Sequence, residues 1–299
     1  MTEDTTPGGR AYEPPSLTLR HGSGREATGD SRDRLRALRM LPGNVPSAEE
    51  IFAAYPQFAG STCVFVSGSL TLGWGHAHSD LDLYVVSADG GAAASGPAGL
   101  LEDRAFAEDA VAPVALGEIG QFRADIELWG EGQVDELIRR FTPRPPPGRV
   151  TVRRGERDLL YRLTTGVAVT GHAWWDARRQ AVLASGYGQW LARNRKVHAE
   201  GALEDASGLL ISGDPDAAAL AAREGYVAGL EMVLALHADF SSSHKWLLRR
   251  LLSASPAEVG AGEAREVLLM ADCARDPAAW ARRTVSAAQR LILMIEERL

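Results

Sequence analysis

The sequence is poor in cysteine, with only Cys63 and Cys273 among its 299 residues. The two stand far apart and lack the close spacing of a metal-binding or redox pair. Two cysteines cannot form the disulfide framework on which small secreted domains depend. We therefore expect both to be free, buried thiols in a reducing compartment.

Long apolar runs are also missing. No uninterrupted stretch approaches the length of a membrane span, and the N-terminus carries Glu3 and Asp4 where a signal peptide would be apolar. These absences predict a soluble, cytoplasmic protein that does not enter a membrane.

An excess of positive charge is the third absence. Lys and Arg total 32 against 39 Asp and Glu, which gives a formal net charge of -7. Long-range attraction to a nucleic-acid backbone is not expected at this balance. A nucleic-acid partner is thus disfavoured, a small-molecule partner is the simpler prediction, and a homodimer stays open.

The chain divides by composition into three parts. Residues 1–32 mix Pro, Gly, Ser, Thr and charges without periodicity, which predicts a flexible arm. Residues 33–147 contain strand-like runs, and the Pro-rich segment 142–148 interrupts regular structure. Residues 148–299 show helical periodicity with almost no strand signal. We expect an α+β protein with a small mixed sheet flanked by helices, followed by a separate helical bundle, each with its own core.

Specific elements can be named within this plan. Strands are predicted from the apolar, β-branched and alternating runs, and helices from their periodicity and caps, with Ser47 as one N-cap and Asp214 followed by Pro215 as another. The strands are expected at 62–67, 83–86, 111–116 and 122–129, a loop at 90–99, and helices at 33–40, 48–52, 135–141, 214–237, after Ser241–Ser243, and at 277–297.

The most informative pattern is Gly68-Ser69 after the first strand, followed by Asp80-Leu81-Asp82 before the second. Alternation along a strand sends Asp80 and Asp82 to one face, where two like charges require a cation. Mg²⁺ prefers such oxygen ligands and is typically held by one or two carboxylates and substrate phosphates. A glycine turn lets backbone N–H groups approach a phosphate, and the Ser69 hydroxyl adds a donor.

A third carboxylate is expected from the alternating strand at 122–129, where Asp125 and Glu127 share a face. Asp125 is preferred as the third ligand, and Glu127 is either a general base or solvent-facing. Beyond residue 150, Lys245 and Arg249 lie one helical turn apart. They either neutralise phosphates or form a solvated basic face.

A glycine-serine turn, a connection of about ten residues and Asp-x-Asp entering a hydrophobic strand resemble the DNA polymerase β-type nucleotidyltransferase superfamily. The general plan is similar to its aminoglycoside and lincosamide branch. The resemblance implies transfer of a nucleoside monophosphate, with AMP preferred, from a Mg²⁺-bound nucleoside triphosphate to a hydroxyl of a small molecule such as an antibiotic or natural-product intermediate. It implies that Asp80, Asp82 and Asp125 hold two Mg²⁺ ions, and that Gly68 and Ser69 hold the β- and γ-phosphates. We expect Ser79, Lys245 and Arg249 to add to the nucleotide site.

Several alternatives stay open. His76 and His78 are either metal ligands or solvated loop residues, and Trp246 either packs or stacks on a ring. Dehalogenase-type phosphatases and many glycosyltransferases also use Asp-x-Asp, but their hydrophobic strand precedes the acidic pair. The acceptor could instead be a protein or an RNA, as in protein AMPylation, toxin-antitoxin pairs or tRNA modification. A degenerate nucleotide-binding scaffold is the non-enzymatic alternative.

Overall fold

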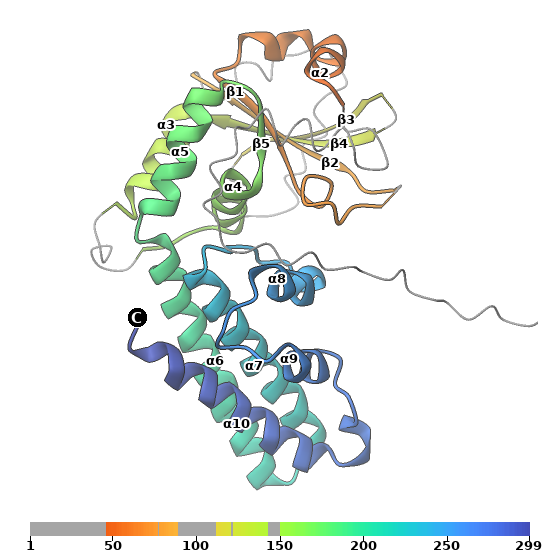
Figure 1. The fold of residues 1–299 in the computed structure, drawn as a ribbon, viewed down its shortest axis with the longest axis vertical. Helices are drawn as coiled ribbons and strands as arrows, with labels where there is room; N and C mark the ends of the chain where they lie inside the picture. Colours follow the sequence, from red (N-terminus) through yellow and green to blue (C-terminus); the bar gives the residue numbers. More distant parts are fainter. Residues whose placement is uncertain (1–45, 77, 89–111, 121, 143–149) are drawn as a thin grey trace, which may run out of the picture.

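The computed structural model describes residues 46–76, 78–88, 112–120, 122–142 and 150–299. The predicted arm, the helix at 33–40 and the loop at 90–99 lie outside these ranges. Figure 1 shows a mixed sheet with its helices at one end of the molecule and long helices at the other. The predicted α+β class is confirmed.

Within the described ranges the sheet has five strands, in the order β3-β4-β2-β1-β5. Their bounds are Cys63–Ser67 for β1, Leu81–Ser87 for β2, Val114–Ile119 for β3, Phe122–Gly130 for β4 and Val167–Thr170 for β5. Only β2 and β4 run parallel, and the other neighbours are antiparallel. The start of β2, the start of β4 and the end of β1 therefore meet at one end of the sheet.

One face of the sheet packs against the first described helix. Helix α2 (Ala48–Ala54) and the short 3₁₀ helix η1 (Pro56–Gly60) bury Ile51 and Phe58 against apolar side chains of all five strands. The predicted N-cap is confirmed, because Ser47 Oγ accepts from the Glu50 N–H and the Glu50 side chain accepts from the Ser47 N–H.

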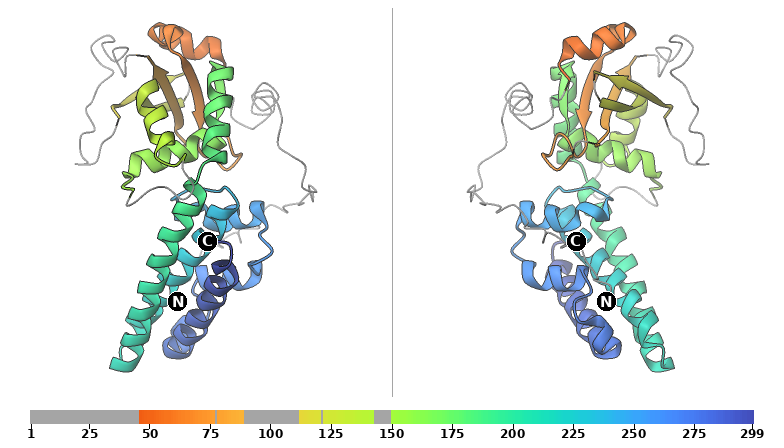
Figure 2. Two further views of the ribbon diagram at one scale, coloured as in Figure 1. Left: turned by 90° about the vertical axis from the view of Figure 1, so that its left-hand side faces the viewer. Right: turned by 90° about the vertical axis from the view of Figure 1, so that its right-hand side faces the viewer.

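The opposite face is covered by α3 (Glu131–Arg139), α4 (Arg154–Thr165) and α5 (His172–Ala184), as Figure 2 shows from two sides. The predicted helix at 135–141 begins four residues too late. The Gln133 side chain accepts the Gly130 N–H at 2.8 Å and thereby stabilises an earlier first turn. The predicted strand at 111–116 is also displaced, since β3 runs three residues further.

The remaining helices form the second half of the molecule, where α7 lies between α6 and α10. The predicted Asp214 cap is confirmed by its bond from the Ala217 N–H at 3.1 Å, and the last helix starts at the predicted Pro277. No described helix combines the length and apolarity that a membrane span needs. The bounds are Tyr187–Ser212 for α6, Pro215–Leu236 for α7, His244–Trp246 for η3, Leu247–Ala254 for α8, Ala261–Leu268 for α9, Cys273–Arg275 for η4 and Pro277–Glu296 for α10.

The sheet extends beyond the Pro-rich segment, before which the sequence predicts its last strand. Strand β5 follows the Pro-rich segment and pairs with β1, so the sheet is completed after residue 148 and the expectation of a purely helical remainder is wrong. One continuous cluster of buried side chains runs from Phe65 and Tyr84 on the sheet to Leu291 on α10. A second cluster lies between the sheet and α2, so the buried side chains do not divide at residue 148. The domain limits themselves stay a prediction.

Gly171, between β5 and α5, provides a test of this junction. Its φ is +67°, and a Cβ there would lie 2.1 Å from the Thr62 carbonyl oxygen. We expect Gly171→Ala to lower the free energy of unfolding by about 1–3 kcal/mol, because strain and overpacking add. Gly208→Ala is the control: Gly208 lies within α6 with open space around it, and the change should stabilise by about 0.5–1 kcal/mol. Urea unfolding midpoints measure the change in stability of both variants. An unchanged midpoint in Gly171→Ala would contradict the close packing of Gly171 against Thr62.

Candidate active site

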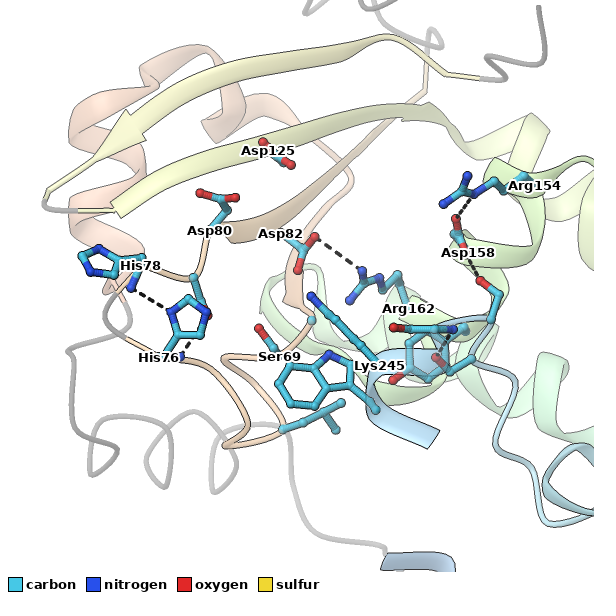
Figure 3. A pocket seen from close by; sticks show the side chains of 18 residues that line it. Ser69, His76, His78, Asp80, Asp82, Asp125, Arg154, Asp158, Arg162 and Lys245 are labelled. Carbon is cyan, nitrogen blue, oxygen red and sulfur yellow. Dashed lines mark hydrogen bonds and ion pairs between the residues drawn. The ribbon is translucent and has the colours of Figure 1, made fainter. Parts of the chain in front are cut away.

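A cavity of about 390 Å³ opens where the end of the sheet meets the second half of the molecule. Its walls come from the start of β2 and of β4, the turn after β1, helix α4 and the segment before α8, as Figure 3 shows. Segments far apart in the sequence therefore build one site.

Three of the predicted carboxylates, those of Asp80, Asp82 and Asp125, line this cavity together. The parallel register pairs Asp82 with Asp125, so their side chains leave the same face of neighbouring strands. Asp80 comes two residues before Asp82 and joins that face. The three aspartates that the sequence pattern singled out therefore lie close together at the starts of β2 and β4.

Gly68 allows the backbone of the turn after β1 to approach the Asp82 carboxylate closely. Its φ is +93°, and a Cβ at this position would lie 1.7 Å from Asp82 Oδ2. The turn is closed by the Ser69 carbonyl, which accepts from the N–H groups of Trp74 and Gly75 at 2.8 and 2.9 Å. Gly68 and Ser69 both line the cavity, and their predicted role in holding phosphates stays a prediction.

Arg162 of α4, which the sequence did not single out, is the main cation facing Asp82. Its Nη2 lies 3.5 Å from Asp82 Oδ1. Burial raises the pKa of Asp82 above its usual value, the Arg162 charge opposes this, and the charges of Asp125 and Asp80 add to it. An added cation would relieve this crowding of negative charge.

Asp80 is held by a second arginine. Arg123 of β4 donates from Nε and Nη2 to Asp80 Oδ1 at 2.9 and 2.7 Å. The guanidinium is largely exposed, with 75% of the side chain accessible, so this pair contributes little to stability. It can be exchanged for another cation at small cost.

Glu127 does not line the cavity, although it shares a strand face with Asp125. Its carboxylate accepts from the Tyr84 hydroxyl at 3.1 Å and from the Trp129 indole Nε1 at 3.0 Å. Burial raises its pKa, which those two hydrogen bonds lower in part. Between the two candidates for the third carboxylate, the geometry favours Asp125.

The predicted cations of the helical half are separated by the structure. Lys245 lines the cavity, whereas Arg249 does not, and its guanidinium lies 4.9 Å from the centre of the Trp246 ring. Trp246 also lines the cavity and contacts Trp74 of the glycine turn, with ring centres 5.7 Å apart. This contact connects the two halves of the site.

The helix expected after Ser241–Ser243 is present as α8, but no side chain of these serines caps it. The Ser241 Oγ accepts the Ser243 N–H, and the Ser242 hydroxyl donates to Asp158 of α4 at 3.0 Å. A 3₁₀ turn, η3, precedes the helix instead. All three serines and Asp158 line the cavity opposite the strand carboxylates.

The loop before Asp80 contributes His76, His78 and Ser79 to the cavity wall. The His76 Nδ1 accepts the His78 N–H at 3.1 Å, and the Ser79 Oγ accepts the His76 N–H at 2.9 Å. These contacts shape the loop. Ser79 is thus near the site, as predicted, with its oxygen engaged by the backbone.

The donor set can be compared with what Mg²⁺ requires. Within the described ranges, no three His, Cys, Asp or Glu side chains converge closely enough to form a complete metal centre. Mg²⁺ does not need one, because one or two carboxylates suffice when phosphates and waters supply the other ligands. The register partners Asp82 and Asp125, with Asp80 beside them, fit this mode of binding in donor type.

Comparison with known proteins adds little to this geometry. No protein-family model matches the chain, and no curated protein does. A nucleotidyltransferase-like protein from Exiguobacterium sibiricum is similar in structure, with a TM-score of 0.46 and 9% identity over 83% of this chain and 74% of that one. So distant a likeness does not assign the chain to a family.

Gly68→Ala tests the close approach of the turn to Asp82. The new methyl group must displace that carboxylate. We therefore expect the affinity for Mg²⁺, in the presence of a non-hydrolysable nucleoside triphosphate, to fall at least about tenfold, because geometric errors of this size are costly in positioned sites. Gly213→Ala is the matched control, since Gly213 has a φ of +83° with nothing near its Cβ. Calorimetric titration of both variants provides the comparison, and equal affinities would contradict the argument.

Proposed function

We propose that the protein is a nucleotidyltransferase of the polymerase β type, which transfers a nucleoside monophosphate, with AMP preferred, from a nucleoside triphosphate to a hydroxyl of a small molecule. The observation that carries the proposal is the register of Asp82 with Asp125 beside the Gly68 turn. Carboxylates for cations and a turn for phosphates then share one cavity.

The phosphate tail is assigned to the side of the cavity formed by Gly68, Ser69 and Lys245. A backbone turn with positive φ suits an anion, and the Lys245 ammonium adds charge. Arg162 lies beside Asp82 and is buried enough that its charge acts strongly on a nearby phosphate. These groups position the triphosphate.

Asp80, Asp82 and Asp125 are the residues that would hold Mg²⁺. When bound, Mg²⁺ supplies charge that stabilises the attacking and leaving oxygens of an in-line displacement. For Asp80 to take this role, Arg123 must release Oδ1. The exposure of that pair makes the exchange inexpensive.

The reaction follows from these positions. The acceptor hydroxyl oxygen forms a bond to the α-phosphorus, the bond from that phosphorus to the bridging oxygen breaks, and pyrophosphate leaves. Asp125 receives the hydroxyl proton, because it is the cavity carboxylate on β4 and Glu127 is engaged elsewhere. Positioning and electrostatic stabilisation supply most of the acceleration.

The proposal is tested by pyrophosphate release from the four nucleoside triphosphates with Mg²⁺ and a panel of hydroxyl acceptors. We expect Asp82→Asn to lower kcat at least about a hundredfold through lost charge stabilisation. Asp135→Asn is the control, because Asp135 pairs with Arg178 on the surface away from the cavity. Full activity of Asp82→Asn would exclude the mechanism.

The assignment of the third carboxylate has its own test. Asp125→Asn should lose activity to a similar extent, while Glu127→Gln should keep kcat within about threefold. A glutamine can accept a hydrogen bond from the Trp129 indole and donate one to the Tyr84 hydroxyl. The unfolding free energy of the Glu127→Gln protein should therefore change by at most about 1.5 kcal/mol. The reverse pattern in kcat would make Glu127 the base.

A further inference from the structure

A second cavity, of about 340 Å³, lies along β3 and β4 next to the first. Asp80 and Asp125 line both cavities and so form their common wall. The other walls of the second cavity include Leu116, Glu118 and Arg123. A volume of this size is typical of sites for small molecules.

In-line displacement places the attacking and leaving oxygens on opposite sides of the α-phosphorus. The phosphate tail is assigned to the side of Gly68 and Lys245, and the reacting phosphorus to the carboxylates of the common wall. The far side of that wall is the second cavity. An acceptor bound there faces Asp125, the group that takes its proton.

We propose that the second cavity is the acceptor subsite, and that it takes an uncharged, polyhydroxylated small molecule of sugar-like size. This inference rests on the proposed function and adds to it the place and the chemical class of the acceptor.

The edge strand β3 fixes the polar wall of this subsite. The Tyr55 hydroxyl accepts the Glu118 N–H at 3.0 Å and donates to the Glu118 carbonyl at 3.2 Å. Gly117 permits this contact, because a Cβ there would lie 2.0 Å from the Tyr55 hydroxyl. Glu118 is thereby held directly opposite its register partner Arg123.

This wall determines which acceptors fit. Glu118 offers a carboxylate that accepts hydrogen bonds, and the Arg123 guanidinium offers several donors. Leu116, the register partner of Asp125, adds an apolar surface. Neighbouring hydroxyls satisfy both polar groups. Asp80 and Asp125 are assigned to the cations, so the acceptor itself faces Glu118 and Arg123, one charge of each sign. This balance favours an uncharged acceptor over an acidic one.

Leu116→Trp, which fills the cavity, is the first test. Radiolabelled ATP, Mg²⁺ and a panel of neutral monosaccharides and polyols, with the matching uronic acids, are the probes. We expect Leu116→Trp to lower transfer to the neutral probes at least tenfold, while the Kd of a non-hydrolysable ATP analogue stays within twofold. Leu269→Trp, at an exposed leucine on the other half, should leave both unchanged.

Glu118→Lys keeps the test decisive if the tryptophan variant does not fold. It should reduce transfer to neutral probes and raise it to uronic acids. If both variants transfer to the neutral probes at the rate of the wild-type protein, the second cavity is not the acceptor subsite. Wild-type preference for uronic acids, or labelling of RNA or protein but none of the probes, would also overturn the proposal, because each contradicts the chemical class. If the wild-type protein does not bind the ATP analogue at all, the proposed function itself is refuted.

Discussion

The site depends on the contact between the Gly68 backbone and the Asp82 carboxylate. Only glycine allows this approach, because any Cβ would overlap Asp82 Oδ2. The contact brings a turn suited to phosphates against a carboxylate suited to cations. Around it, Arg162 and Lys245 lower the cost of gathering negative charge in a partly buried cavity. The proposed chemistry exploits this same balance, in which carboxylates held close together favour an added cation.

The fold serves this contact through two features. The parallel pairing of β2 with β4 places two strand starts side by side, and antiparallel β1 delivers its end to the same place. Helix α4 then connects the sheet to the helical half, since it contributes Asp158 and Arg162 to the cavity and buries Leu159 and Leu163 in the shared core. The cavity is therefore part of the packing between the two halves, which fixes its walls relative to one another.

Local signals predicted much of this arrangement. Local signals sufficed for the apolar runs of β1, β2 and β4, for the Ser47 and Asp214 caps, and for Asp80, Asp82 and the pair Asp125 and Glu127. Each follows from the pattern of a strand or from a short-range hydrogen bond. Arg162 and Asp158 were not predicted. They lie within an amphipathic helix, where charged residues are ordinary, and only the docking of α4 turns them towards the acids. Strand β5 was missed for a related reason, since four residues carry too little pattern.

The sequence by itself determined strands β1, β2 and β4, the glycine turn and the residues that would carry metal-assisted chemistry, because these depend on contacts between neighbours in the chain. Only the tertiary structure distinguished the positions of Asp125 and Glu127: Asp125 lines the cavity, and Glu127 accepts a hydrogen bond from Tyr84 of the neighbouring strand. It likewise placed side chains of the sheet and of the long helices in one shared cluster, and it separated Lys245 from Arg249 at the cavity. Such choices depend on which surfaces pack together, and no periodicity along the chain encodes that.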